Sequence, residues 1–106
     1  MTLDTERRLD SHRDRAVAGA RAATAALAQL GVRTTVTGSL ARGSFGLHSD
    51  VDLLVTSCPR SLKYAIEGIV EDMLGGMPFD VIYLDELPVW RAAGFMRDAI
   101  DASQLG

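Results

Sequence analysis

Residues 38–55 read GSLARGSFGLHSDVDLLV, and this stretch decides the fold. It opens with a Gly-Ser pair directly after residues 32–37, a short β-branched run typical of a strand. Ten residues then separate that pair from Asp50 and Asp52, which open a second apolar run. A third acid, Asp80, lies in a separate strand-like run, PFDVIYL. A glycine turn that can approach phosphate and three acids that can hold a divalent metal together point to phosphate chemistry.

The segments around this stretch predict an alternation of helices and strands. Alanine dominates residues 16–28, and Gly31 follows as a stop, so residues 4–30 are expected to form one helix. The further expected elements are helical turns at 39–44, a strand at 51–56, a helix at 59–74, a strand at 79–84 and a helix from Pro88 to about Ala102. This order predicts an α/β (α+β) fold with a small mixed sheet of about three strands, flanked by helices in two or three layers.

The two later helices each carry apolar residues at the spacing of one helical face. The expected buried faces are Leu62, Ile66, Ile69 or Val70 and Met73 in the first, and Val89, Ala93, Met96 and Ile100 in the second. Trp90, Phe95 and Met96 also gather on the last helix. Aromatic residues and methionine are enriched in interface cores, but a small core uses them too, so both interpretations stay open.

Composition narrows the class of protein. The chain has 106 residues, 47% of them hydrophobic, which fits one domain spanning 1–106 with one core. The net charge of −3 argues against nucleic acid as the main partner, because such binding needs a basic footprint. The single cysteine, Cys58, excludes an internal disulfide. A charged N-terminus without the apolar core of a signal peptide, and no membrane-spanning run, lead us to expect a soluble cytoplasmic protein.

The acids suggest a metal site. Residues two apart in a strand face the same side of the sheet, so Asp50 and Asp52 are expected to point together, with Val51 and Leu53 in the core. Two adjacent carboxylates repel unless a cation sits between them, and Mg²⁺ takes one or two carboxylates together with substrate phosphates. If the strand of Asp80 is a neighbour, Asp80 completes the site and can also accept a proton.

Gly38 and Ser39 have a separate expected task. A glycine after a strand lets backbone N–H groups approach a phosphate, and a helix that starts near Ser39 would direct its positive end there. Arg42, one turn on, could contact phosphate or pair with an acid. Taken singly, an Asp-x-Asp pair is usually a set of solvated surface acids and a Gly-Ser pair an ordinary turn. Their combination with a third acid on a third strand favours a site.

At these positions the chain resembles the minimal nucleotidyltransferases of the DNA polymerase β superfamily. Their G-S-x-A-R-G…S-D-x-D-L-x-V signature is matched at Gly38, Ser39, Ala41, Arg42, Gly43, Ser49, Asp50, Asp52, Leu53 and Val55. The resemblance implies the nucleotidyltransferase fold. It also implies that Asp50, Asp52 and Asp80 bind metal, two Mg²⁺ ions being expected, that Asp80 is the third catalytic acid, and that Gly38 and Ser39 hold the triphosphate of ATP.

Small members of this superfamily resemble antitoxins encoded beside HEPN-domain ribonuclease toxins. The resemblance implies transfer of AMP from ATP to a tyrosine of the cognate toxin, which silences it. Two alternatives stay open: a non-catalytic antitoxin that blocks the toxin by binding, and one subunit of a transferase that modifies a small molecule. A homo- or hetero-oligomer is compatible with each of these.

Overall fold

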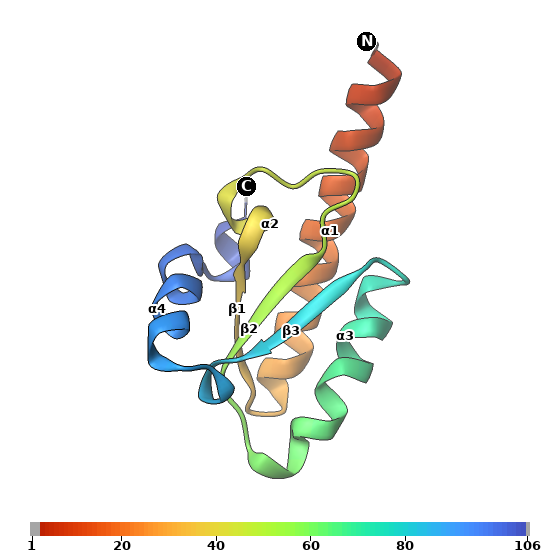
Figure 1. Ribbon diagram of the computed structural model, residues 1–106. Helices are drawn as coiled ribbons and strands as arrows, with labels where there is room; N and C mark the ends of the chain where they lie inside the picture. The colour runs from red at the N-terminus through yellow and green to blue at the C-terminus, as the bar shows by residue number, and fades with distance from the viewer. Residues whose placement is uncertain (1–2, 106) are drawn as a thin grey trace.

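A computed structural model describes residues 3–105 and shows a three-stranded sheet with helices on both sides (Figure 1). The elements in chain order are α1 (Leu3–Gln29), β1 (Arg33–Thr37), α2 (Gly38–Arg42), β2 (Val51–Ser57), α3 (Ile66–Leu74), β3 (Phe79–Tyr83) and α4 (Val89–Asp98). Short 3₁₀ helices cover Arg60–Ala65, Leu84–Glu86 and Ala102–Gln104. The predicted α/β class, with a small mixed sheet of three strands, is confirmed.

The first helix ends where the sequence predicts. Gly31 has a positive φ of 82°. The N–H of Val32 donates to the carbonyl of Leu27, and that of Gly31 donates to Ala28, both at 3.0 Å. This pair of bonds is the Schellman arrangement, in which a left-handed glycine satisfies the last carbonyls of the helix. The chain can therefore reverse at once into β1, which lies beside the end of α1.

The sheet has the strand order β1-β2-β3 and is mixed. Strand β2 is antiparallel to β1 and parallel to β3, so α3 with its preceding 3₁₀ turn serves as the crossover between the parallel pair. The pairing places Thr37 opposite Asp52 on one side and Asp80 opposite Asp52 on the other. The amino ends of β2 and β3 therefore lie beside the carboxyl end of β1.

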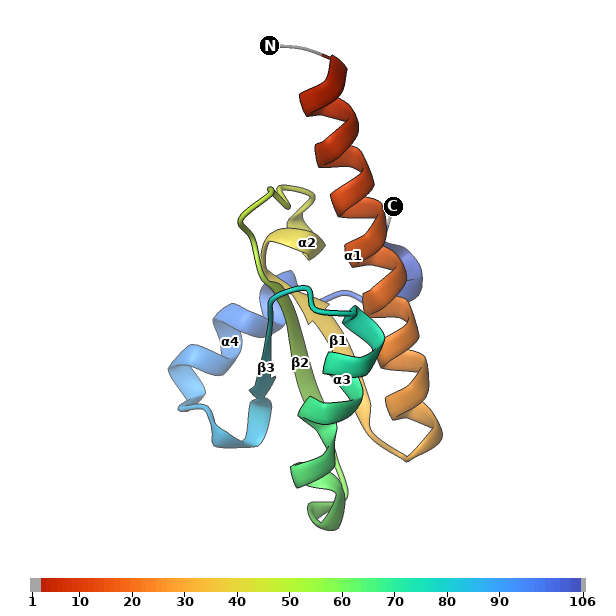
Figure 2. The same cartoon turned by 90° about the vertical axis from the view of Figure 1, so that its right-hand side faces the viewer.

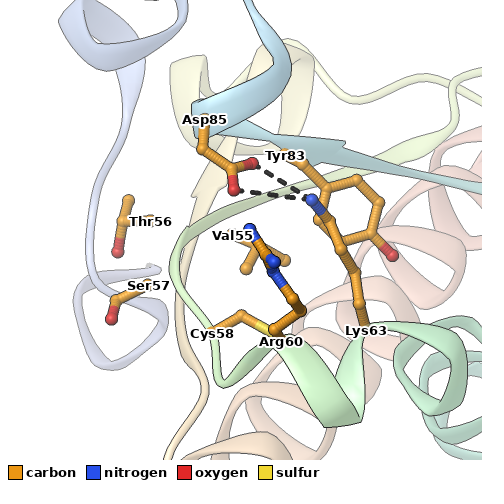
Figure 3. A pocket seen from close by; sticks show the side chains of 8 residues that line it. All are labelled: Val55, Thr56, Ser57, Cys58, Arg60, Lys63, Tyr83 and Asp85. Atoms are coloured by element: carbon orange, nitrogen blue, oxygen red, sulfur yellow. Dashed lines mark hydrogen bonds and ion pairs between the residues drawn. The ribbon is translucent and has the colours of Figure 1, made fainter.

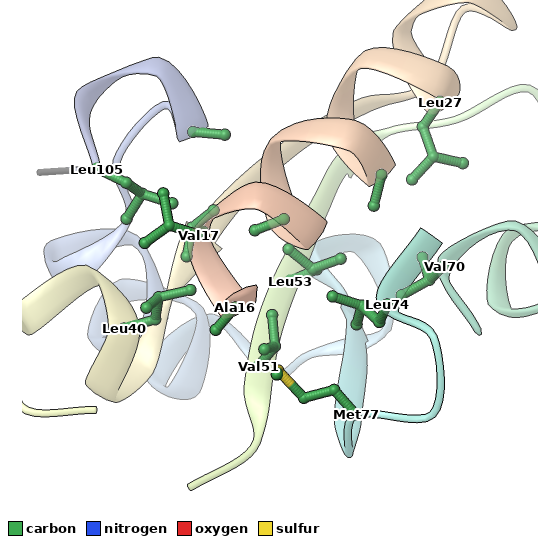
Figure 4. Close-up of a cluster of buried hydrophobic side chains, with 14 of the residues drawn as sticks. Ala16, Val17, Leu27, Leu40, Val51, Leu53, Val70, Leu74, Met77 and Leu105 are labelled. Carbon is green, nitrogen blue, oxygen red and sulfur yellow. The ribbon is translucent and has the colours of Figure 1, made fainter. Parts of the chain in front are cut away.

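The core lies between the sheet and the pair α1 and α3 (Figures 2 and 4). Val51, Leu53 and Val55 alternate along β2 and are buried on this side, as the sequence predicts for the first two. Leu27 of α1 and Val70 of α3 cover them. Helix α4 lies on the opposite side of the sheet (Figure 2), so the molecule has three layers.

Two helix predictions need correction. The segment predicted as one helix over 59–74 begins as a 3₁₀ turn and becomes α-helical only at Ile66. Its buried face is Ile66, Val70 and Leu74, whereas Met73 is 43% exposed. Two neighbouring stripes of apolar residues fit the helical spacing of this segment. The stripe that contains Leu74 is the buried one, because it packs against α1.

The last helix is shorter and more exposed than predicted. It ends at Asp98 because Ile100 forms a β-bridge to Val36, with N···O distances of 2.8 and 2.9 Å, which requires extended backbone. No residue of α4 is buried, and Val89 is 89% exposed, so the predicted buried face is wrong. None of the helices within residues 3–105 has the length and apolar character needed to cross a membrane.

A glycine sets how closely α1 approaches α3. A Cβ placed on Gly19 would clash with the Leu74 side chain and lie 3.5 Å from the Leu74 Cα. We expect Gly19→Leu to lower the free energy of unfolding by about 1–3 kcal/mol, the usual cost of overpacking a core. Urea denaturation measures this. Ala18→Leu, at the exposed neighbouring position of the same helix, is the control and should change stability little. Equal losses in the two variants would contradict the close packing.

Candidate active site

The three predicted acids lie at one end of the sheet. Asp52 is the second residue of β2 and pairs in register with Asp80 on the parallel strand β3. Asp50 is exposed and comes just before β2, so only Asp52 of the predicted pair lies in the strand itself. The neighbouring strands thus bring Asp80 to Asp52 across about 30 residues of sequence, as the argument from the sequence required.

Asp52 lies near two other carboxylates, those of Asp80 and Asp50. Its side chain is partly buried, and this burial raises the pKa of Asp52 above the ordinary value. The charges of Asp80 and Asp50 raise it further, whereas that of Arg42 acts in the opposite direction. Burial and like charges both disfavour an ionised carboxylate. The arrangement is costly for the protein alone, and a bound cation would relieve the cost.

Gly38 touches the same carboxylate. It is the first residue of α2 and has a φ of +71°. This position has no room for a side chain, because a Cβ there would clash with Asp52 Oδ2 and lie 3.0 Å from Asp52 Cγ. Ser39 is the second residue of α2, so the helix begins one residue earlier than predicted, after Thr37 as its cap. Because α2 has only five residues, its dipole is small, and any phosphate contact there depends on individual N–H groups and the Ser39 hydroxyl.

Arg42 pairs with an acid, one of the two roles that the sequence left open. Its guanidinium lies 3.2 Å from the carboxylate of Asp98 on α4, and both side chains are partly exposed. An exposed pair of this kind contributes little to stability, typically about 0–1 kcal/mol. Its charge still reaches Asp52, so a role of Arg42 toward phosphate stays a prediction.

A cavity of about 350 Å³ opens beside Asp52, which is the one of the three predicted acids that lines it. Thr37, Gly38, Arg42 and Asp52 line one part of it, and α4 supplies the rest through Arg91, Gly94, Phe95 and Asp98. The sequence argument did not assign these four residues of α4 to the site. The available signal was the Arg-x-x-x-Phe spacing, which puts Arg91 and Phe95 on the same helical face, but Phe95 was considered only as a core or interface residue.

The cavity wall is tied to the sheet by a buried threonine. The hydroxyl of Thr37, which is 1% exposed, donates to the main-chain carbonyl of Phe95 at 3.1 Å. Phe95 belongs to the last turn of α4, where carbonyls have no partner within the helix. Because Thr37 also stands opposite Asp52, a single residue connects the strands that carry Asp52 and Asp80 to the helix that lines the cavity.

The donor set fits Mg²⁺ that arrives with its phosphates. Within residues 3–105, no group of three or more His, Cys, Asp or Glu side chains is arranged so that it could hold a metal ion by itself. Mg²⁺ is usually held by one or two carboxylates plus substrate phosphates and water, and seldom by an all-protein cage. Asp52 and Asp80, paired across two strands with Asp50 close enough to act on Asp52, offer that open arrangement.

A second cavity, of about 390 Å³, lies at the other end of β2 and β3 (Figure 3). It contains Lys63, whose ammonium lies 3.3 Å from Asp85 and 4.8 Å from the centre of the Tyr83 ring. None of the predicted site residues lines it. The ammonium of Lys63 is already paired with Asp85 and Glu86, whereas three of the predicted site residues, Gly38, Arg42 and Asp52, line the other cavity.

Comparisons with known proteins show the family to which the chain belongs. The family model described as a nucleotidyltransferase domain matches residues 20–101. A solved structure assigned to a minimal nucleotidyltransferase superposes with a TM-score of 0.63 at 29% sequence identity, covering 94% of this chain and 95% of that one. A search of curated proteins found no match. The matched region contains the whole sheet, all three acids and α4, and the chain belongs to the nucleotidyltransferase domain family.

Proposed function

We propose that this chain transfers AMP from ATP to a protein hydroxyl, with a tyrosine of a cognate HEPN ribonuclease toxin as the acceptor, and so acts as an antitoxin. Nucleotidyl transfer itself follows from the family. The single observation that carries the catalytic proposal is the register that places Asp80 beside Asp52, with Gly38 packed against the same carboxylate. A protein that only covered its partner's surface would have no need of this charge-crowded arrangement.

The residues have distinct roles in this proposal. Asp50, Asp52 and Asp80 hold the divalent metal, with two Mg²⁺ ions expected, and Gly38 and Ser39 lie against the triphosphate. Bound Mg²⁺ would neutralise the phosphates and stabilise the charge that develops on the attacking and leaving oxygens. Asp80 accepts the proton of the acceptor hydroxyl as its oxygen attacks the α-phosphorus. The bond from the α-phosphorus to the bridging oxygen then breaks, and pyrophosphate leaves.

The exposed face of α4 supports a protein as the acceptor. Trp90 is 78% exposed and Val89 is 89% exposed, at the start of the helix that forms the cavity wall. Exposed apolar residues that gather next to a site are typical of surfaces that bind other proteins. These exposed apolar side chains therefore favour a protein over a small molecule as the acceptor.

Intact-mass spectrometry tests the proposal. We expect the HEPN protein encoded beside this chain to gain mass in units of one AMP when it is incubated with this chain, ATP and Mg²⁺. Asp80→Asn, which removes the proton acceptor, should give no gain. If the parent neutralises the ribonuclease without a change in mass, and the variant lacking all three acids does so equally well, the non-catalytic alternative is right. Transfer to a small molecule but not to the HEPN protein would favour the third alternative.

A further inference from the structure

The cavity beside the acids has a positively charged wall that the proposed mechanism does not use. Arg91 is the third residue of α4, is exposed to solvent, and lines the cavity together with Asp52. It therefore lies on a different element from Gly38 and Ser39. Any anion that enters the cavity meets the carboxylate of Asp52 on the sheet side. On the helix side it meets the guanidinium of Arg91 and the carboxylate of Asp98, which is paired with Arg42.

The charge of Arg91 is held in place but is not neutralised. Its guanidinium lies over the Phe95 ring, 5.6 Å from the ring centre. In the part of the chain that the structure describes, no carboxylate lies within ion-pair distance of Arg91, whereas Arg42 in the same cavity is paired with Asp98. A ring beneath a guanidinium attracts it electrostatically and leaves its N–H groups free. Arg91 is thus the cavity arginine that is ready for an anion.

The helix that carries Arg91 is fixed relative to the acids. Within residues 3–105, two polar side-chain contacts join α4 to the rest of the fold: the Thr37 hydroxyl to the Phe95 carbonyl, and Arg42 to Asp98. Thr37 comes directly before Gly38, and Arg42 comes after it in the same short helix, α2. The position of Arg91 is therefore set from the same turn that packs against Asp52.

We propose that Arg91 binds the β- and γ-phosphates of the nucleoside triphosphate, and that Phe95 is the positioning residue that orients its guanidinium. This inference rests on the proposed function, because the acids must hold the α-phosphate end. The remaining phosphates then extend toward the opposite wall. The planar fork of arginine donates two parallel hydrogen bonds to a phosphate, a geometry that lysine cannot reproduce. Arg91 would also hold the pyrophosphate as it leaves.

Calorimetric titration with ATP and with AMP, both in Mg²⁺, tests the role of Arg91. We expect Arg91→Gln to weaken ATP binding about 10- to 100-fold, as for the loss of charged hydrogen bonds, and to leave AMP binding unchanged. Arg91→Lys should recover only part of the loss. The control is Arg97→Gln, an exposed arginine of the same helix outside the cavity, which should bind both nucleotides as the parent does. Equal ATP affinity in Arg91→Gln and the parent would overturn the proposal.

A double-mutant cycle tests the positioning role of Phe95. Phe95→Leu keeps an apolar side chain but removes the ring, so ATP binding should weaken about 2- to 5-fold in the parent. In the Arg91→Gln background the same change should have no further effect, because no guanidinium is left to orient. Equal losses in both backgrounds would show that Phe95 acts only on the packing of α4.

The same titrations separate this inference from the function on which it rests. If the parent binds no nucleotide with or without Mg²⁺, the proposed function and the role of Arg91 both fail. If the parent binds ATP, and binding is lost in Asp50→Asn with Asp52→Asn but not in Arg91→Gln, only the role of Arg91 is wrong.

Discussion

Replacing Asp52 by asparagine is expected to reduce AMP transfer by at least about 100-fold, the scale of losing one preorganised electrostatic element at a reacting phosphate. Asparagine keeps the size of the side chain, so the register with Asp80 and the contact with Gly38 should persist. What it removes is the negative charge that would hold the metal between the strands. Intact-mass analysis of the acceptor measures the rate of transfer.

The same substitution should stabilise the protein when no metal is present. Burial and the charges of Asp80 and Asp50 both disfavour an ionised Asp52, so a neutral amide there relieves repulsion. We therefore expect the melting temperature of Asp52→Asn in EDTA to be higher than that of the parent. Asp10→Asn, an exposed acid on α1, is the control and should leave both activity and melting temperature nearly unchanged. If the melting temperature of Asp52→Asn were lower than that of the parent, the carboxylate of Asp52 would stabilise the fold, and the repulsion argument would be wrong.

Gly38→Ala is expected to abolish activity while Gly43→Ala does not. Both glycines have a positive φ, of 71° and 82°, so alanine brings a similar backbone strain of about 1–2 kcal/mol at either position. Only at Gly38 would the added Cβ collide with Asp52, whereas no atom lies within 4 Å of a Cβ at Gly43. The collision must push the carboxylate away from Asp80 or open α2 from the sheet, and either change would disrupt the proposed metal site.

Comparing the two glycine variants isolates the contact with Asp52 from backbone strain. Chemical denaturation should show a larger loss of stability for Gly38→Ala, and the mass assay should show transfer retained by Gly43→Ala alone. Retained transfer in Gly38→Ala would mean that Asp52 can move without cost, and that the glycine serves only the turn.

The strands and the positions of the acids in the sheet could be predicted because short sequence patterns determine them. The β-branched run before Gly38, the two-residue period around Asp52 and the stop at Gly31 each fix one element without knowledge of the rest of the chain. The proximity of Asp80 to Asp52 needed one further step, that neighbouring strands in a small α/β sheet share an edge, and the parallel register confirms it.

The role of α4 could not be predicted because it depends on contacts distant in sequence. Its end at Asp98 is set by the bridge from Ile100 to Val36, and its position by the hydroxyl of Thr37. Helical periodicity suggested a buried face, but α4 contributes Arg91 and Phe95 to the lining of a cavity and buries no residue completely. A hydrophobic pattern shows which residues are apolar, and the fold decides whether they meet a core, a ligand or a partner.

The most direct test of the account is a calorimetric titration of ATP into the parent protein and into the variant with Asp50, Asp52 and Asp80 all changed to Asn, each in Mg²⁺ and in EDTA. The account predicts that the parent binds ATP in Mg²⁺ and loses most of that affinity in EDTA, and that the triple variant binds weakly and equally in both. If the triple variant bound ATP in Mg²⁺ as tightly as the parent, the assignment of the metal site to these three acids would be wrong.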